Sequence, residues 1–246
     1  MGGNDTPAIR LFVEAALAPG AEIACTAEQA NYLVNVLRLG TGAEILAFNG
    51  RDGEWRARLA EVAKRRCTLR SVALERPQQG GPDVHYLFAP LKHARLDYMV
   101  QKATEMGVAH LQPVLTRRTA VSRVNLERMR ANAIEAAEQC GVLRVPTVGE
   151  PAKLSGLLDA WDPARRLIFC DEGASLANPL AALRSVVAGP LAVLVGPEGG
   201  FEAAERDLLH KQPFAVAISL GPRIMRADTA AVAALALVNA TLGDWR

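Results

Sequence analysis

The chain has 246 residues, half of them hydrophobic, which is enough to bury one large core or two smaller ones. Its formal net charge is only +2, so binding to a polyanion must come from local basic patches. Four cysteines without CxxC spacing exclude a disulfide framework and a cysteine zinc site as simple interpretations. The longest apolar run, residues 229–242, is shorter than the ~20 residues that span a bilayer. The start of the chain also lacks a secretory signal, so we expect a cytoplasmic protein with no metal and no membrane partner.

Residues 1–76 have the pattern of a small β-rich domain. Thr26 and Gln29 fit a capping box, which predicts a helix that runs through Val36. The segment NGRDG at residues 49–53 tolerates a left-handed backbone and predicts a hairpin between the strands on either side of it. Residues 77–83 are polar and rich in proline and glycine, which predicts a linker. The predicted strands of this domain are residues 9–13, 43–48, 54–60 and 68–74.

Residues 84–246 alternate short apolar runs with helical segments, which predicts an α/β domain with a parallel sheet. Pro113 indicates an irregular or edge position in its strand. The last helix, capped by Asp228 or Thr229, is apolar on all sides, so we expect it to be buried against this chain's core or a second subunit. The predicted strands are residues 85–89, 108–115, 167–170, 191–195 and 214–220, and the predicted helices cover residues 96–106, 125–139, 202–211 and 228–242.

Two of these apolar runs end in glycine turns, GPEGG at residues 196–200 and GPR at residues 221–223. Ligands bind beyond the carboxyl ends of parallel strands, where we expect the two turns to lie side by side. The chain has neither GxGxxG nor GxxxxGK[ST], which argues against a dinucleotide or a P-loop phosphate. Bare glycine backbone suits an adenine edge and ribose hydroxyls, and Glu198 disfavours a polyphosphate. The alternative is that both are ordinary strand-to-helix turns.

The two turns belong to segments that resemble the signatures of the RsmE family of SPOUT-class RNA methyltransferases. GPEGGF at residues 196–201 and LGPRIMRADTA at residues 220–230 are similar to these signatures, with Met225 and Asp228 as mild departures. The resemblance covers nearly the whole chain, because upstream family segments match in order: NYLVNVLRL at residues 31–39, LKHARLDYMVQKATEMGV at 91–108, TRRTAV at 116–121 and EAAEQCG at 135–141. Asn35 and Val142 stand where the family usually carries basic residues, and Arg144 could substitute for the second.

The resemblance implies a SPOUT-type knotted parallel-sheet methyltransferase domain preceded by a small PUA-like β-barrel domain. It also implies S-adenosyl-L-methionine as cofactor, N3 of a uridine in 16S ribosomal RNA of the small ribosomal subunit as target, and a homodimer with pockets near the interface. A third loop, residues 171–173, is expected near the cofactor. The predicted cofactor contacts are Leu194, Val195, Gly196, Pro197, Glu198, Gly199, Gly200, Ser219, Leu220, Gly221, Ile224, Met225 and Arg226.

Methylation of uridine N3 indicates a role for an arginine. That nitrogen carries a proton in neutral uracil, so negative charge must develop on the base, and a cationic side chain would stabilise it. Arg223 and Arg226 bracket the second glycine turn, and Arg226 is the first candidate for this catalytic role. Arg226 could instead pair with Asp228 or cap a helix. No histidine matches a signature position, so no general base is identified.

Basic and amide side chains are the candidates for RNA contacts. Exposed lysines and arginines bind phosphates, although the same residues could form a solvated surface. Phe201 is expected to pack under the first glycine turn rather than to stack on a base. The candidates are Arg10, Arg38, Lys92, Arg117, Arg118, Gln139 and Arg144, with Lys64, Arg65, Arg66 and Arg70 as further possible phosphate contacts.

Two other functions compete with uridine methylation. The same fold could act on a ribose 2′-oxygen or on tRNA, although the intact signatures and the PUA-like front domain disfavour this. The chain could also be a non-catalytic RNA-binding or assembly protein. The intact glycine turns argue against that alternative, because a protein without a cofactor does not need bare backbone at these positions.

Overall fold

The computed structural model describes residues 9–63, 66–174 and 178–245. The chain divides into two compact units. The first contains the residues up to Gly80 together with Ala137–Val145, and the second contains Gly81–Ala136 and Pro146–Arg246. Residues 137–145, which sequence order would assign to the second domain, therefore belong to the first unit.

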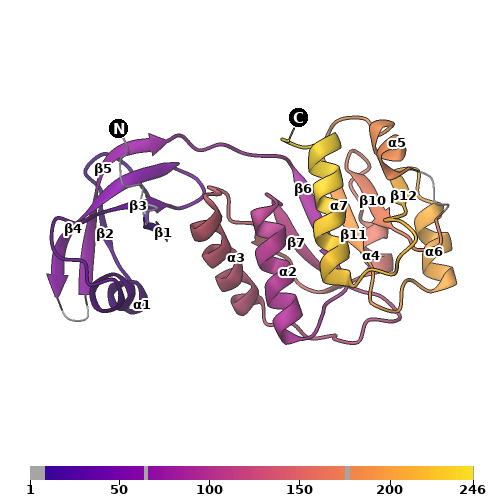
Figure 1. The fold of residues 1–246 in the computed structure, drawn as a ribbon, viewed down its shortest axis with the longest axis horizontal. Helices are drawn as coiled ribbons and strands as arrows, with labels where there is room; N and C mark the ends of the chain where they lie inside the picture. The colour runs from indigo at the N-terminus through magenta and orange to yellow at the C-terminus, as the bar shows by residue number, and fades with distance from the viewer. Residues whose placement is uncertain (1–8, 64–65, 175–177, 246) are drawn as a thin grey trace. The chain divides into compact units, whose positions relative to one another are not determined.

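In the described part of the first unit, the strands form a five-stranded sheet in the order β1-β3-β4-β5-β2 (Figure 1). The predicted hairpin is confirmed, because Glu44 pairs with Arg58 and Phe48 with Glu54 in antiparallel register. Strand β2 was not predicted, since three residues with a single buried side chain are too short to show a period. The strands are β1 (Arg10–Phe12), β2 (Glu22–Ala24), β3 (Glu44–Phe48), β4 (Glu54–Ala63) and β5 (Arg66–Arg76).

The predicted helix of the first unit begins at its capping box and then changes form. Thr26 Oγ1 accepts a hydrogen bond from the Gln29 amide, and Gln29 Oε1 accepts one from the Thr26 amide. Helix α1 (Ala27–Ala30) continues as a π-helix, η1 (Asn31–Val36). Arg38 follows with a φ of 57° and is the one non-glycine residue in the described ranges with a positive φ. The helix therefore ends in a backbone conformation that an L-residue adopts only at a cost.

The second unit is built on a parallel sheet in the order β12-β10-β11-β6-β7-β8, with β9 paired to β7. Pro113 lies in β7 between the residues that pair with β8 and those that pair with β9, which fits the predicted irregularity. The five predicted strands are confirmed, while the two-residue strands β8 and β9 were missed. The strands are β6 (Val84–Phe88), β7 (His110–Leu115), β8 (Thr147–Val148), β9 (Ala152–Lys153), β10 (Arg166–Cys170), β11 (Leu191–Val195) and β12 (Ala215–Ile218).

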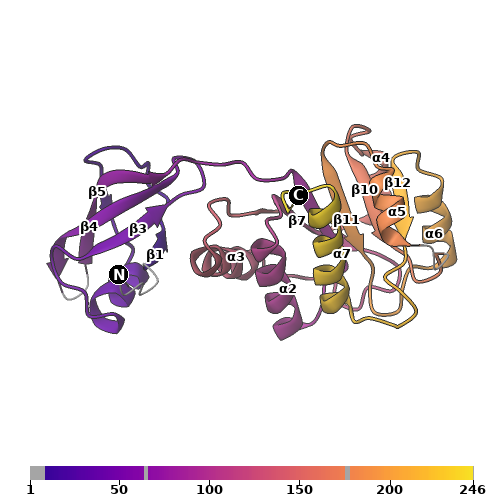
Figure 2. The ribbon, with the colours of Figure 1, turned by 45° about the horizontal axis from the view of Figure 1, so that its top comes forward.

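The apolar last helix packs inside the second unit, where α7 contacts α2, α5 and β11. Figures 1 and 2 show α7 alongside α2. Asn239 fixes this pairing by donating a hydrogen bond to the Met106 carbonyl at 2.8 Å. The N-cap of α7 is Arg226, without a side-chain cap bond, so the predicted caps at Asp228 and Thr229 were wrong. The helices are α2 (His93–Glu105), α3 (Leu126–Cys140), α4 (Leu154–Asp159), α5 (Pro179–Arg184), α6 (Ala203–His210) and α7 (Ala227–Thr241).

Candidate functional site

Three strands of the second unit end at the same edge of the sheet. The last residue of β10, Cys170, is in register with Val195 of β11 on one side and with Ile218 of β12 on the other. The sequence predicted that the two glycine turns lie side by side, and this was wrong for the sheet. Strand β10 and the loop that follows it lie between them. All three loops nevertheless line one cavity of about 100 Å³.

The cavity gathers most of the predicted cofactor residues. Leu194, Gly199 and Arg226 are the exceptions, since they do not line it. Leu194 is fully buried in the core of the unit. Arg223, in contrast, does line the cavity. The predicted residues that line it are Val195, Gly196, Pro197, Glu198, Gly200, Ser219, Leu220, Gly221, Ile224 and Met225.

Gly196 is required by its close packing, and Gly200 and Gly221 are required by their positive φ. A Cβ on Gly196 would lie 3.0 Å from the ring of Phe201, which is buried under the first turn as expected. Gly200 has a φ of +68° and donates its amide to the Pro197 carbonyl at 2.8 Å, which closes the turn. Gly221 has a φ of +102° with open space around the position of a Cβ. The turns therefore present bare backbone to the cavity.

The loop between the two turns carries a buried carboxylate, Asp171, which is 3% exposed. Asp171 Oδ2 accepts a hydrogen bond from Arg206 Nη2 at 3.0 Å and lies 3.1 Å from His210 Nε2, while Oδ1 accepts one from the Gly173 amide. Burial raises the pKa of Asp171, but these hydrogen bonds outweigh burial and hold the pKa below its usual value. Asp171 therefore stays ionised and anchors its loop to α6.

Sequence patterns did not reveal the partners of Asp171. Arg206 and His210 are four positions apart on α6, which places them on one face of that helix. This spacing was the available signal, but nothing in the sequence showed which carboxylate would face it. Asp171 and Glu172 line the cavity, where the third loop was expected, and Arg206 lines it as well.

The first glycine turn is also held from the outside by two arginines. Arg118 Nη1 donates to the Gly199 carbonyl at 2.6 Å, and Arg95 Nη1 pairs with the Glu198 carboxylate. The backbone amide of Arg117 donates to Glu205 Oε1 at 2.8 Å. Of the two predicted RNA contacts in this loop, Arg118 therefore contacts the first glycine turn, and Arg117 contacts the helix that follows it.

Arg10, a predicted RNA contact, is used inside the first unit. Its side chain is 9% exposed and donates to Glu54 Oε1 at 2.6 Å. It also donates to the carbonyls of Ala137, Glu138 and Val142, which satisfies the end of α3. The guanidinium donors of Arg10 are therefore directed to protein oxygens, and an RNA contact at this residue stays a prediction.

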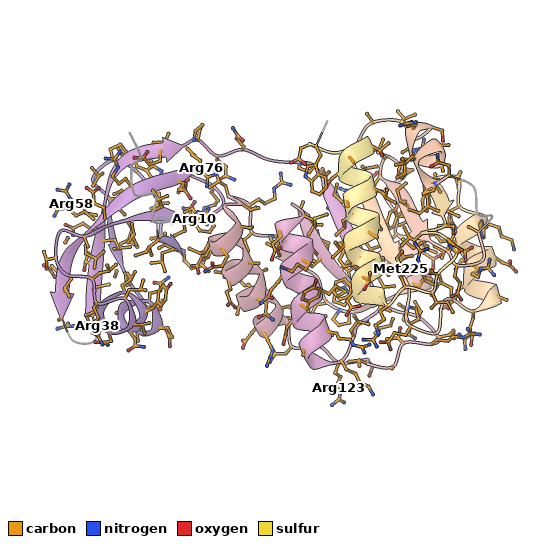
Figure 3. The ribbon with its side chains drawn as sticks, viewed as in Figure 1. Arg10, Arg38, Arg58, Arg76, Arg123 and Met225 are labelled. Atoms are coloured by element: carbon orange, nitrogen blue, oxygen red, sulfur yellow. The ribbon has the colours of Figure 1, made fainter. Side chains whose placement is uncertain are left out.

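The other RNA candidates are at or near the surface. Figure 3 labels Arg38 at the edge of the first unit and Arg10 among its strands. Gln139 lines a surface cavity of about 680 Å³ with Tyr32 and Arg76. Lys92 is exposed at the N-cap of α2 and Arg144 is half-buried. Arg66 and Arg70 are exposed, and Arg70 pairs with Glu22, whereas Lys64 and Arg65 lie outside the described residues.

Two classes of feature are missing from the described ranges. No group of at least three His, Cys, Asp or Glu side chains there could hold a metal ion. No helix there has the length and apolar character that crossing a membrane requires.

Comparison with known proteins identifies the family. Residues 79–239 match the model described as RNA methyltransferase domain, and residues 26–70 match the RNA methyltransferase PUA domain. Ribosomal RNA small subunit methyltransferase E of Synechocystis sp. is 31% identical, over 96% of this chain and 78% of that protein. The protein of the same name from Rickettsia conorii is 28% identical, over 94% of each chain.

Solved structures agree with the sequence comparison. Ribosomal RNA small subunit methyltransferase E from Neisseria gonorrhoeae, bound to S-adenosyl methionine, matches with a TM-score of 0.86 at 27% identity, covering 97% of this chain and 100% of that one. The putative methyltransferase Lpg2936 from Legionella pneumophila, in complex with the same cofactor, matches with a TM-score of 0.84 at 28% identity, with the same coverage. The chain therefore belongs to the RsmE family of RNA methyltransferases.

Proposed function

We propose that this chain uses S-adenosyl-L-methionine to methylate N3 of a uridine in 16S ribosomal RNA of the small ribosomal subunit. The observation that carries the proposal is the single cavity lined by both glycine turns at the ends of β11 and β12. Solved relatives with this fold are bound to S-adenosylmethionine, and the curated relatives are named for small-subunit ribosomal RNA. The position of the methyl group on the uridine comes from the family resemblance.

The residues of the cavity fit this cofactor. Bare backbone at the glycine turns suits the adenine edge and ribose hydroxyls, and Leu220, Met225 and Ala230 provide apolar surface for the base. The carboxylate of Glu172 complements a cationic ligand, whereas that of Glu198 is already paired with Arg95. The cavity volume is smaller than the roughly 300–1,000 Å³ of typical ligand pockets. We therefore expect residues 221–226, where Ile224 is 92% exposed, to shift outward when the cofactor binds.

Bound S-adenosylmethionine supplies a methyl group that its sulfonium already activates. The protein must orient the uracil toward that methyl group and stabilise the negative charge that develops as N3 loses its proton. Arg226 was the first candidate from sequence, and Arg223 gains support because it lines the cavity. Asp228 Oδ1 accepts from the Thr229 amide, and no ion pair between Arg226 and Asp228 occurs within the described residues. Both arginines are proposed as catalytic residues.

The proposal extends to partners and location. Arg38, Lys92, Arg117, Gln139 and Arg144 are proposed to contact the RNA. A homodimer is proposed from the family resemblance. A cytoplasmic location is proposed because the curated relatives are named for ribosomal RNA.

An acceptor assay tests the function. The purified chain is incubated with S-adenosylmethionine labelled in its methyl group in two parallel reactions. One contains small ribosomal subunits from cells lacking the protein, and the other contains total tRNA. The proposal expects label in the small-subunit RNA alone. Label in tRNA would favour the alternative substrate. No label, together with no rise in melting temperature on adding the cofactor, would favour a non-catalytic RNA-binding protein, because a ligand that binds the folded state must stabilise it.

A further inference from the structure

The loop after β7 touches the first glycine turn through one arginine. Arg118 Nη1 lies 2.6 Å from the Gly199 carbonyl oxygen and donates to it. The Cδ atom of the same side chain lies 3.5 Å from the position that a Cβ on Gly199 would occupy. The aliphatic part of Arg118 therefore lies along the turn, while its guanidinium holds the peptide oxygen.

The loop that carries Arg118 is itself fixed. The Thr116 amide donates to Thr119 Oγ1 at 2.8 Å, and the Thr119 amide donates to the Thr116 carbonyl at 3.2 Å. The Arg117 amide donates to Glu205 Oε1, and Glu205 Oε2 accepts from the Glu202 amide at the start of α6. The loop that carries Arg118 is therefore hydrogen-bonded to α6, the helix that follows the first glycine turn.

The first glycine turn needs such a support. Adjacent glycines have more backbone freedom than other residues, and ordering them costs conformational entropy. Inside the turn, one hydrogen bond joins the Gly200 amide to the Pro197 carbonyl. The Gly199 carbonyl points to Arg118 instead, and Gly199 does not line the cavity. Fixing this carbonyl orients the peptide between Gly199 and Gly200, and Gly200 does line the cavity.

We propose that Arg118 is a positioning residue that preorganises the first glycine turn for S-adenosylmethionine, rather than the RNA contact that the sequence predicted. This inference rests on the proposed function only for the identity of the cofactor. Holding the turn in its binding conformation before the ligand arrives lowers the cost of binding. Arg117, the next residue back, is bonded through its backbone and keeps the RNA role.

The adjacent arginines form a matched pair for the test, since each substitution by alanine removes one exposed positive charge from the same loop. The dissociation constant for S-adenosylmethionine is measured by titration calorimetry on the full chain without RNA, and steady-state kinetics follow. For Arg118→Ala we expect the cofactor dissociation constant and KM to rise roughly tenfold, as for loss of one charge-assisted hydrogen bond, with kcat and the KM for RNA nearly unchanged. For Arg117→Ala we expect unchanged cofactor binding and a raised KM for RNA.

Arg118→Lys provides the conservative variant, because its ammonium can still donate one hydrogen bond to a carbonyl. It should recover part of the cofactor affinity. If the alanine variant does not fold, the cofactor affinity of Arg118→Lys is compared with that of the wild type instead. Wild-type cofactor affinity in Arg118→Ala, with a loss confined to RNA, would overturn the inference. Equal effects of the Arg117 and Arg118 substitutions on cofactor binding would overturn it too. Failure of the wild-type chain to bind the cofactor would instead contradict the proposed function.

Discussion

Arg206 Nη2 donates to Asp171 Oδ2 at 3.0 Å, which joins the end of β10 to helix α6. The Asp171 side chain is 2% exposed and the Arg206 side chain is 36% exposed. Asp171 opens the loop after β10, so this pair connects one loop of the cavity to the helix that follows the first glycine turn. It is therefore a support of the site as well as of the fold.

Asp171→Asn should destabilise the protein by about 1–3 kcal/mol, because it removes the buried charge that accepts from Arg206. Urea unfolding of the variant and the wild type measures the difference. Asp207→Asn, at an exposed position on the same helix, is the control and should change stability by less than about 0.5 kcal/mol. Equal midpoints for Asp171→Asn and the wild type would show that the pair contributes nothing.

Arg38 allows backbone strain to be separated from charge, because its φ is 57°. Arg38→Gly and Arg38→Ala both remove the charge, but glycine adopts a left-handed backbone at little steric cost. The glycine variant should therefore be more stable than the alanine variant by about 1 kcal/mol. Both should bind small-subunit RNA more weakly than the wild type, with a shallower dependence on salt. Unchanged RNA binding in both variants would remove Arg38 from the proposed RNA surface.

The lowered pKa of His85 should make the stability of the protein depend on pH. Burial, then the positive charges of Arg165 and His110, lower the pKa of His85 from 6.5 to about 4, against the opposite effect of Asp83. Between these values the unfolded chain binds a proton that the folded chain does not, so stability should fall as the pH drops from 6.5 toward 4. Denaturant midpoints at several pH values measure this slope.

The control for this slope is His85→Gln, which removes the titrating group and should flatten the dependence in that window. Asp171, with its lowered pKa, contributes stability that is lost only at lower pH, as the pH falls through its folded pKa. An equally steep slope in His85→Gln would assign the dependence to other groups.

Arg226→Ala and Arg223→Ala test which arginine stabilises the charge on uracil. Loss of the catalytic arginine should lower kcat by about 10²–10³-fold, while the affinity for S-adenosylmethionine changes little. Single-turnover methyl transfer and calorimetry on the same preparations measure the two effects. Normal turnover in one variant removes that residue from the catalytic role, and normal turnover in both contradicts the proposal.

Helices and strands were predicted best from the sequence where a clear hydrophobic pattern lies between clear boundary residues. Strand β11 has the predicted bounds, because an apolar run lies between Pro190 and Gly196. The short elements β2, α4 and α5 were missed, since three to six residues do not establish a period. The order β12-β10-β11 was also out of reach, because chain order does not state which strands are neighbours. The trefoil knot implied by the family stays a prediction.

The candidate site shows the same limit at the level of single residues. The glycine turns could be found, because their chemistry lies in consecutive residues. The partners of Arg10 and Asp171 could not, because Glu54 is 44 positions from the first and Arg206 is 35 from the second. Arg118 was assigned to RNA from its charge, its place after a strand and the family resemblance, none of which shows its hydrogen bond to Gly199, 81 positions away.

The most direct test of the function is to identify the methylated nucleoside. Small ribosomal subunits from cells lacking this protein are treated with the purified chain and S-adenosylmethionine, and the RNA is digested to nucleosides for mass spectrometry. The proposed function predicts N3-methyluridine, which is absent when the chain or the cofactor is omitted. A methyl group on another nucleoside or on a ribose, or no methylation by a chain that binds the cofactor, would contradict it.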